Sequence, residues 1–409
     1  MERPTQAVIL AGGRGSRLRP LTDARPKPLI EFHGRPFLGY LLELLREQGF
    51  EQVLLLLGYL PEAIQSYCGD GRRWNLSIDS VVSDVEDDTG RRLKLAASRL
   101  APVFLLCYCD NYWPMPFARM WQRYLATGAE AMLTVYENRE RYTKDNVRLD
   151  DEGRIITYDK DRARPGLSGV EIGYGLLRRE LIAALPDANC CFEREVYPRL
   201  AAAKALWAFA TGHRYYSVSS HERLPLTEQF LARRPAVILD RDGVLNARPP
   251  KAQYVRSWAD WQWISGALDA LRLLNEAGVR VIVISNQAGI ARGAMTQVDV
   301  EAIHDRMRQE AQEAGGRIEA VYYCPHGWDE GCACRKPKPG LLFQAQRDWG
   351  LDLSRTPFFG DDERDGQAAE AAGCPWLQVT EQRSLLKLTR ECLSERPVFE
   401  RRTPHVALI

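Results

Sequence analysis

The sequence predicts an α/β protein with two doubly wound domains, each built on a mainly parallel sheet. Three observations predict this fold: apolar runs that end in glycine-rich or acidic turns, helical stretches that follow them, and a fresh start of the same pattern near residue 236. At 409 residues the chain is also too long for one ordinary hydrophobic core. We therefore expect domains at 1–233 and 234–393, followed by a C-terminal tail at 394–409.

Hydrophobic patterning gives the elements of the first domain. The runs Ala7–Leu10, Val53–Leu57 and Val103–Cys109 predict buried strands, and Pro36–Gln48 predicts an amphipathic helix. A helical stretch within Glu222–Pro235 closes this domain.

The second domain begins at once with another strand. Ala236–Leu239 predicts that strand, and an acidic turn follows it. Ala267–Glu276 predicts a helix that stops before Gly278, and Val279–Ile284 predicts the next strand. A short apolar run at Pro357–Phe359 precedes a further acidic turn.

Composition excludes several classes of partner and location. Lys and Arg total 55 against 54 for Asp and Glu, so charge gives no reason to expect nucleic acid or an acidic membrane as a partner. The longest apolar run, Val103–Cys109, is far shorter than the roughly 20 residues of a membrane span. We expect a cytoplasmic protein without a leader, whose ten cysteines are reduced thiols and metal ligands. The oligomeric state stays open.

Four separated segments carry chemistry that fits one reaction, and they are Asp240-Arg241-Asp242, Ser285-Asn286-Gln287, Arg335-Lys336 and Gly360-Asp361-Asp362 with Asp365. Two carboxylates at i and i+2, Asp240 and Asp242, suit a Mg2+ site where one attacks phosphorus and the other moves a proton. The hydroxyl of Ser285 and the charge of Lys336 suit a phosphoryl group, and Asp361 adds a metal carboxylate. Because α/β sheets place ligands at the carboxyl ends of strands, the segments predict a magnesium-dependent phosphatase.

These residues resemble the haloacid-dehalogenase superfamily over roughly 236–379, and most of all its D-glycero-D-manno-heptose 1,7-bisphosphate phosphatases and the related histidinol phosphatases. The resemblance implies that Asp240 is the nucleophile and Asp242 the general acid and base. It implies that Asp361 binds Mg2+ together with both. It also assigns phosphate stabilisation to Ser285 and Lys336, and substrate contacts to Asn286, Gln287 and Arg335.

Three thiols and one imidazole stand just before the third segment, at Cys324, His326, Cys332 and Cys334. Together they form a complete tetrahedral Zn2+ set with no position open for water, which is typical of a structural site. We expect the zinc to fold this loop and to aim Arg335 and Lys336. The pattern also marks the heptose bisphosphate phosphatase branch that the segment resembles.

The N-terminal strand runs into a glycine-rich, basic loop. We expect nucleotide contacts at Leu10, Ala11, Gly12, Gly13, Arg14 and Gly15. The loop is no Walker motif, because no Gly-Lys-Ser/Thr follows, and it lacks the third glycine of the dinucleotide fingerprint. Four arginines and one lysine between residues 14 and 27 offer countercharge for a triphosphate, which carries about four negative charges near neutral pH.

This loop and the downstream Pro26-Lys27-Pro28 resemble the sugar-phosphate nucleotidyltransferases over roughly 6–231. The resemblance implies attack of a sugar 1-phosphate oxygen on the α-phosphorus of a nucleoside triphosphate, with release of pyrophosphate. It implies triphosphate contacts for Arg17 and Lys27, and a Mg2+ ligand at Asp110. It further assigns sugar-phosphate binding to Lys160, a sugar pocket to Gly173 and Glu193, and a base-contacting turn to Thr89 and Gly90.

One departure from this family concerns the metal. A second metal Asp often lies in an Asp-Ile-Gly-Thr segment near the domain's end, and the matching stretch here is Ser217-Val218-Ser219-Ser220. A hydroxyl is a much weaker Mg2+ ligand than a carboxylate. Two interpretations stay open: Asp110 holds the ion together with the nucleotide phosphates, or this half is slow or only binds nucleotide.

The two resemblances together predict a bifunctional enzyme of nucleotide-sugar synthesis. It would remove the 7-phosphate of D-glycero-D-manno-heptose 1,7-bisphosphate and then transfer a nucleotidyl group, with GMP from GTP as the first candidate, to heptose 1-phosphate. The alternatives are a nucleotide-sensing N-terminal domain beside an active phosphatase, or another phosphosugar with another nucleotide. The expected partners are sugar phosphates and a nucleoside triphosphate, with Mg2+ in both domains and a structural Zn2+.

Overall fold

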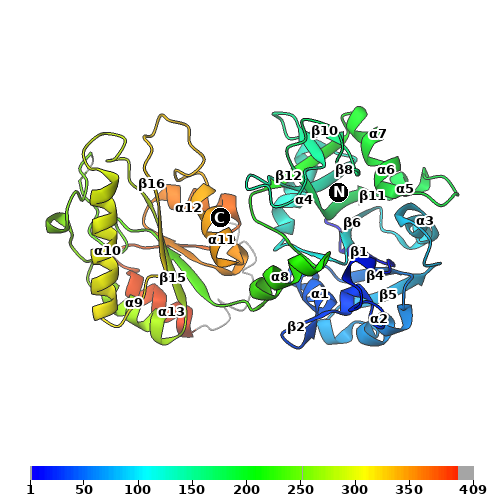
Figure 1. Cartoon of the computed structure of the whole chain (residues 1–409), viewed down its shortest axis with the longest axis horizontal. Coiled ribbons are helices and arrows are strands. Elements are labelled where there is room, and N and C mark those ends of the chain that lie inside the picture. The colour runs from blue at the N-terminus through cyan, green and yellow to red at the C-terminus, as the bar shows by residue number, and fades with distance from the viewer. Residues whose placement is uncertain (1, 251, 395–409) are drawn as a thin grey trace. The chain divides into compact units, whose positions relative to one another are not determined.

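The computed structural model describes residues 2–250 and 252–394. The chain divides into two compact units, Met1–Ala232 and Arg233–Ile409 (Figure 1). The expected C-terminal tail lies outside the described residues except for Ser394. Among the described residues, no helix combines the length and the apolar character that a membrane crossing requires.

The N-terminal unit is built on a seven-stranded sheet with the order β12-β8-β11-β6-β1-β4-β5. These strands are β1 Gln6–Ala11, β4 Gln52–Leu57, β5 Ser77–Val82, β6 Val103–Tyr108, β8 Ala131–Tyr136, β11 Val170–Arg178 and β12 Leu206–Thr211. Strand β11 runs antiparallel to both of its neighbours, and every other pair in the sheet is parallel. The prediction of a mainly parallel sheet is confirmed, with β11 as the exception.

Helices cover both faces of this sheet. The helices are α1 Phe37–Glu47, α2 Pro61–Cys68, α3 Thr89–Leu95, α4 Phe117–Thr127, α5 Glu180–Ala183, α6 Phe192–Glu195, α7 Tyr197–Ala202 and α8 Leu224–Leu231. The short strands of this unit, outside the main sheet, are β2 Glu31–Phe32, β3 Arg35–Pro36, β7 Asn111–Tyr112, β9 Val147–Leu149, β10 Ile155–Tyr158 and β13 Tyr216–Ser217. Successive β1 side chains alternate between two apolar clusters, with Ile9 in one and Val8 in the other. The sheet is therefore buried on both faces, as its apolar strands predict.

The C-terminal unit is built on a five-stranded parallel sheet with the order β16-β15-β14-β17-β18. Its strands are β14 Ala236–Leu239, β15 Arg280–Asn286, β16 Ala320–Cys324, β17 Phe358–Gly360 and β18 Trp376–Gln378, and its helices are α9 Ala267–Glu276, α10 Gln297–Glu313, α11 Gly340–Trp349, α12 Glu363–Ala372 and α13 Leu385–Ser394. Apolar residues of α9, α10 and α13 share one core cluster, and those of α11 and α12 share the other.

The order of this sheet creates a place for a site. The chain steps from β14 to β15 on one side and later returns to place β17 on the other side of β14. The carboxyl ends of the three strands therefore meet at a switch point of the strand order, where open α/β sheets bind ligands.

Candidate active sites and metal centre

Asp110 follows β6 closely in the N-terminal unit, and a lysine from a distant loop reaches it. Lys27 lies in the 3-10 turn Lys27–Leu29, and its Nζ is 2.7 Å from Oδ2 of Asp110. Burial opposes the charge of Lys27, but Asp110 outweighs burial, so the pKa of Lys27 is raised. The structure thus brings together the residues predicted to bind the triphosphate and its metal.

The glycine-rich loop makes its tight turn at Gly15, whose φ is +67°. Thr22 Oγ1 donates to the Gly15 carbonyl at 3.0 Å, and a Cβ at this position would lie 3.1 Å from Thr22 Cγ2. Arg17 lies in the 3-10 helix Ser16–Leu18, and its charge partly opposes the rise in the pKa of Lys27. Arg14 forms an exposed ion pair with Glu86. Arg17 and Lys27 therefore act on the same region.

Arg92 on α3 is a buried cation that sequence reasoning missed. Its two terminal nitrogens donate to four acceptors at 2.7–3.1 Å: Leu57 O, Ser83 Oγ, Asp84 O and Val85 O. A Cβ on Gly12 would lie 2.3 Å from Cζ of Arg92, so this position of the loop requires glycine. Arg92 therefore ties the expected nucleotide loop to the ends of β4 and β5. Arg91, the preceding residue, is chemically identical, so the sequence did not indicate which of the two arginines would be buried.

Glu193 on α6 is the centre of a second polar cluster. Lys160 Nζ lies 2.8 Å from its Oε2, and Thr89 Oγ1 donates to the same oxygen at 2.7 Å. Burial opposes ionisation of this carboxyl, but Lys160 and hydrogen bonds from Cys191 and Tyr108 lower its pKa to about 2. The structure thus brings Lys160, Glu193 and Thr89 together in one polar cluster.

Tyr108 connects the two clusters, since it lies two residues before Asp110 and its hydroxyl donates to Oε1 of Glu193. Gly173 packs on the same tyrosine: its φ is +84°, and a Cβ there would lie 2.4 Å from Tyr108 Cδ2. The amide of Gly90 is held by Cys190 O at 2.9 Å. Sequence reasoning missed Tyr108, although its place at the end of β6 marks it.

Ser217 lies beside Asp110, where the expected second metal carboxylate would stand. It pairs with Asn111 across β13 and β7, and Val218 N donates to Asp110 O at 2.8 Å. Its hydroxyl is 2.9 Å from that of Ser219. Within the described residues, the N-terminal unit holds no group of three or more metal-binding Asp, Glu, His or Cys side chains. Asp110 and Ser217 are therefore neighbours, with a hydroxyl at the position expected to carry the second metal carboxylate.

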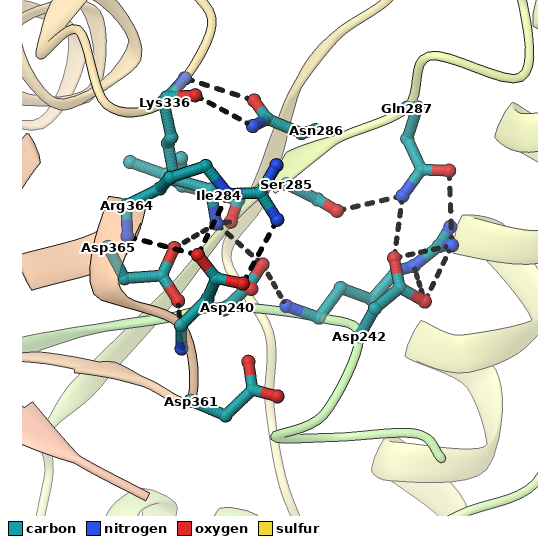
Figure 2. Close-up of polar contacts among 12 residues, drawn as sticks. Asp240, Asp242, Ile284, Ser285, Asn286, Gln287, Lys336, Asp361, Arg364 and Asp365 are labelled. Atoms are coloured by element: carbon teal, nitrogen blue, oxygen red, sulfur yellow. Dashed lines mark hydrogen bonds and ion pairs between the residues drawn. The ribbon is translucent and has the colours of Figure 1, made fainter. Parts of the chain in front are cut away.

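Asp240 follows β14 in the C-terminal unit, and Lys336 binds it directly. Nζ of Lys336 lies 2.8 Å from Oδ1 of Asp240, 2.7 Å from Oδ1 of Asp365 and 3.2 Å from the carbonyl of Ile284 (Figure 2). Burial raises the pKa of Asp240 to about 7, with Lys336 opposing and Asp365 adding to the rise. Asp365 itself is only 1% exposed, and it belongs to the fourth of the sequence segments expected to form this site.

Three carboxylates of this site face one another. Asp240, Asp361 and Asp365 each offer one oxygen, and these oxygens lie within 4.8 Å of one another. Burial raises the pKa of Asp361 to about 6, with Arg248 opposing. A Cβ on Gly243 would lie 1.9 Å from Oδ2 of Asp361, so only glycine allows this approach. Clustered, crowded carboxylate oxygens of this kind fit a hard divalent cation.

Asp242 faces a different set of partners. Its oxygens accept from Arg241 Nη2 at 2.9 and 3.0 Å, from Asn246 Nδ2 at 2.9 Å and from Gln287 Nε2 at 2.9 Å. Burial alone would raise the pKa of Asp242, but Arg241 and the other two donors lower it. Its side chain is thus not part of the carboxylate cluster above, although we expected it there as a ligand.

The segment that ends β15 is fixed by amide side chains. Asn286 Nδ2 donates to Lys336 O at 3.1 Å, and Lys336 N donates back to Asn286 Oδ1 at 3.1 Å. Gln287 Nε2 donates to Ser285 Oγ at 2.8 Å. Ser285 is 1% exposed and lies near Lys336, which binds the carbonyl just before it. Both amides, which we expected to contact substrate, therefore bind protein groups.

Arg241 anchors this network from within the core. It is 1% exposed, and its Nη1 lies 3.2 Å from Nε2 of His304. A guanidinium only donates, so Nε2 of His304 is the acceptor. Burial and the charge of Arg241 lower the pKa of His304 to about 3. The imidazole is therefore neutral and acts as a core acceptor.

The four expected zinc ligands converge. The sulfur atoms of Cys324, Cys332 and Cys334 lie 3.4–3.6 Å apart, and Nδ1 of His326 is 3.2 Å from Cys334 and 3.5 Å from Cys324. Zinc–sulfur bonds of about 2.3 Å place tetrahedral sulfurs roughly 3.8 Å apart, so the set fits zinc. Arg335 Nη1 donates to His326 O at 3.2 Å, which fixes Arg335 to this loop.

Comparisons with known families match each unit separately. The nucleotidyl transferase family matches residues 6–159, and the polynucleotide kinase 3 phosphatase family matches residues 236–369. The chain is 43% identical over 145 residues to the D-glycero-beta-D-manno-heptose-1,7-bisphosphate 7-phosphatase of Bordetella bronchiseptica, which is 35% of this chain and 80% of that protein. The protein of the same name from Pseudomonas aeruginosa is 44% identical over 141 residues, 34% of this chain and 78% of that protein.

Two solved structures are similar to parts of the chain. The crystal structure of the B. bronchiseptica D,D-heptose 1,7-bisphosphate phosphatase, complexed with magnesium and phosphate, is 37% identical, covers 39% of this chain and 99% of its own, and has a TM-score of 0.37. The structure of HddC from Yersinia pseudotuberculosis is 22% identical, covers 56% of this chain and 100% of its own, and has a TM-score of 0.48.

Proposed function

We propose that this chain is a bifunctional enzyme of nucleotide-sugar synthesis, because it belongs through its C-terminal unit to the D-glycero-beta-D-manno-heptose-1,7-bisphosphate 7-phosphatase family and carries a nucleotidyl transferase domain in its N-terminal unit. The phosphatase removes the 7-phosphate of a heptose 1,7-bisphosphate. The transferase then joins the heptose 1-phosphate to a nucleotide, with GMP from GTP as the first candidate. These substrates place the enzyme in the cytoplasm.

The phosphatase reaction uses the arrangement around Asp240. An oxygen of Asp240 attacks the 7-phosphorus, the bond to the sugar oxygen breaks, and the leaving oxygen takes a proton from the carboxylic acid of Asp242. Asp242 enters this step with the proton that it takes from water at the end of the preceding turnover, whereas the donors around it in this structure favour its ionised form. Lys336 and the hydroxyl of Ser285 balance the charge of the phosphoryl oxygens. The proposal is supported by the short contact between Lys336 and Asp240 and by the burial of both.

The second half of the reaction frees the enzyme. Water attacks the phosphorus of the aspartyl phosphate, Asp242 now takes a proton from that water, and the bond to Asp240 breaks to release inorganic phosphate. Arg241 holds Asp242 in its ionised form in this structure, which is the form that this step needs. The sugar leaves with its 1-phosphate intact.

Mg2+ is the proposed cofactor of the phosphatase. Asp240, Asp361 and Asp365 are the carboxylates grouped closely enough to hold it. When bound, it neutralises phosphoryl oxygens and aligns them with the nucleophile. Arg248 now contacts Asp361 at 2.9 Å and would have to share that carboxylate with the ion.

Zn2+ is the proposed structural metal of the loop at Cys324, His326, Cys332 and Cys334. The closed set of four protein ligands supports a structural role. Its place in the sequence, directly before Arg335 and Lys336, links the metal to the phosphate site.

The nucleotidyl transfer uses the N-terminal clusters. An oxygen of the sugar 1-phosphate attacks the α-phosphorus, and the bond to the β-phosphate oxygen breaks to release pyrophosphate. Arg17 and Lys27 stabilise the triphosphate charge, and Lys160, oriented by Glu193, binds the sugar phosphate. Asp110 would hold a Mg2+ shared with the nucleotide phosphates, since Ser217 supplies no second carboxylate.

One observation favours a second candidate for this unit. The hydroxyl of Ser217 lies where a carboxylate was expected, and it forms a hydrogen bond with the hydroxyl of Ser219. A unit with this weaker metal site could bind a nucleotide without turning it over, and so regulate the phosphatase. This candidate predicts nucleotide binding without release of pyrophosphate.

The contact of Lys336 with Asp240 and Asp365 carries the proposal, and product analysis tests it. The purified chain with Mg2+ is given heptose 1,7-bisphosphate, and inorganic phosphate is measured. Each of GTP, ATP, CTP, UTP and dTTP is then added with pyrophosphate as the readout. We expect phosphate release first and pyrophosphate release with one nucleotide. Phosphate release with nucleotide binding but no pyrophosphate favours the sensing candidate, and no phosphate release overturns the phosphatase.

A further inference from the structure

The amide of Gln287 is used completely by protein groups. Both hydrogens of Nε2 have acceptors, Oδ2 of Asp242 at 2.9 Å and Oγ of Ser285 at 2.8 Å. Its Oε1 accepts from Nη2 of Arg241 at 3.1 Å. The side chain is 2% exposed, and Figure 2 shows it between Asp242 and Ser285. An amide has two N–H donors, so none is left for a substrate hydroxyl.

The backbone of Gln287 is also fixed. Its N–H donates to the carbonyl of Cys324 at 2.8 Å, just after β15 ends. Strand β16 ends at Cys324, the first residue of the expected zinc set. The Gln287 side chain therefore starts from a backbone position that is fixed at the end of β15. Its amide group, at the other end, is held by hydrogen bonds to Asp242 and Ser285.

The targets of this amide serve two different parts of the proposed reaction. Ser285 faces the phosphoryl group, and Asp242 exchanges the proton with the leaving oxygen. Within the described residues, Oδ2 of Asp242 accepts from Arg241 and Gln287, whereas Oδ1 accepts from Arg241 and Asn246. Loss of Gln287 would therefore leave Arg241 as the donor to Oδ2 and would remove one of the hydrogen bonds that fix the direction of the Asp242 carboxylate.

We propose that Gln287 is a positioning residue, which fixes the direction of the Asp242 carboxylate relative to Ser285 and does not bind the sugar. The inference rests on the proposed phosphatase reaction, and it replaces the substrate contact expected for Gln287 from its motif. Gln287 acts through Asp242, so its effect should follow the demand for a proton on the leaving oxygen. A direct contact with the sugar would instead change affinity.

The test compares leaving groups. Gln287→Met keeps the length of the side chain and removes its hydrogen bonds. An alkyl phosphate such as heptose 1,7-bisphosphate needs a proton on its leaving oxygen, whereas p-nitrophenyl phosphate leaves as a stable anion. We expect Q287M to lower kcat on the sugar by on the order of 10- to 100-fold, part of the 10²–10⁴ of general acid catalysis. We expect at most about a twofold change in sugar KM and in activity on the aryl phosphate.

A double-mutant cycle gives the second measurement. Asp242→Asn removes the proton donor, so Q287M added to D242N should cost less than about twofold on the sugar bisphosphate. Gln297→Met, at an exposed position on α10, is the matched control and should match the wild type. Zinc content and pyrophosphate release by the N-terminal unit check that the variants are folded.

The outcomes separate the inference from the function on which it rests. An equal loss of kcat on both substrates, a raised sugar KM with kcat unchanged, or the same cost of Q287M with and without Asp242 would overturn the positioning role. In each of these three outcomes, phosphate release by the wild type still supports the proposed phosphatase function. A wild type that hydrolyses neither phosphate would overturn the proposed function and the inference together.

Discussion

Nζ of Lys336 lies 2.8 Å from Oδ1 of Asp240, and the two side chains are only 4% and 8% exposed. A buried cation at this distance restrains a nucleophile and also faces the phosphoryl group that it attacks. Asp365 holds the same ammonium from its other side at 2.7 Å. Lys336 therefore joins two carboxylates of the candidate phosphatase site.

Lys336→Met should lower phosphatase kcat by about 10²–10³, the usual cost of one lost electrostatic donor. It also leaves Asp240 and Asp365 close together without their shared cation. Lys338→Met is the matched control, because Lys338 is exposed and its Nζ donates to the Gly331 carbonyl, away from both aspartates. A steady-state assay of phosphate release measures both variants. Equal activity of K336M and the wild type would contradict this role.

Loss of the zinc loop should weaken the phosphatase alone. Cys334→Ser removes one of the four expected ligands, and we expect zinc to fall from one per chain to a trace in elemental analysis. Phosphatase kcat/KM should fall about 10–100-fold, the usual cost of losing the support of a site, because Arg335 is fixed to His326. Cys190→Ser is the control: Cys190 lies in the N-terminal unit, so this variant should keep one zinc per chain. A wild-type chain purified without zinc and fully active would refute the assignment.

A carboxylate at residue 217 should repair the metal site of the N-terminal unit. Ser217→Asp places an acid beside Asp110, and we expect a lower Mg2+ concentration for half-maximal pyrophosphate release. Ser217→Asn has nearly the same shape without the charge and should not shift this concentration. A titration with Mg2+ at fixed nucleotide measures the difference. If neither variant changes the Mg2+ requirement, the ion does not bind near Ser217.

His304 should make the C-terminal unit less stable in acid. Its pKa is lowered to about 3 in the folded chain by burial and by Arg241, with Asp242 opposing and Arg308 adding, while the ring of Tyr323 packs on it. Between about pH 6.5 and pH 3 the unfolded chain therefore binds more protons than the folded chain. Stability should fall as pH falls through this window, by about 1.4 kcal/mol per pH unit for this group.

The His304→Gln variant isolates that contribution, because its amide oxygen can still accept from Arg241. We expect the difference in free energy of unfolding between the two proteins to change across the window and to be constant above about pH 7. Urea unfolding of the C-terminal unit at several pH values measures it. A pH-independent difference would contradict a neutral, buried imidazole.

Arg92→Met should impair the N-terminal unit and spare the other. Four acceptors lose a donor, and Leu57 O and Asp84 O keep a backbone donor, so the cost is at most about 1–3 kcal/mol for each of the other two. We expect a lower unfolding temperature for that unit and a higher KM for the nucleotide, since Gly12 packs against this side chain. Arg91→Met is the neighbouring control, and phosphate release should be normal in both. A wild-type nucleotide KM in R92M would show that Gly12 keeps its place without Arg92.

Much of the fold followed from local sequence. The alternation and length of apolar runs predicted β1, β4, β6, β14 and β15 and the helices α1 and α9, with ends that differ by one or two residues. The family resemblances of both units are confirmed as well. The direction of β11 did not follow, because an apolar strand reads alike in parallel and antiparallel sheets.

The candidate sites were only partly predictable. Asp240, Ser285 and Asp361 could be placed together because strand ends of a parallel sheet share one edge, whereas Lys336 was placed with them by the family resemblance. The partners of Gln287 depend on where Arg241 and Asp242 point, which is a matter of tertiary packing. Roles for Asn286 and Gln287 taken from motif position therefore named the residues but not the atoms that they bind.

Product analysis in one reaction tests the central claim most directly. The wild-type chain, the variant Asp240→Asn and the variant Lys27→Met are each incubated with heptose 1,7-bisphosphate, GTP and Mg2+, and phosphate, pyrophosphate and nucleotide sugar are measured by mass spectrometry. We predict all three products from the wild type, none from D240N with the bisphosphate, and phosphate alone from K27M. Supplying heptose 1-phosphate to D240N should restore pyrophosphate and nucleotide sugar without inorganic phosphate. A nucleotide sugar that still carries its 7-phosphate, or pyrophosphate release by D240N from the bisphosphate, would contradict the proposed order of the two reactions.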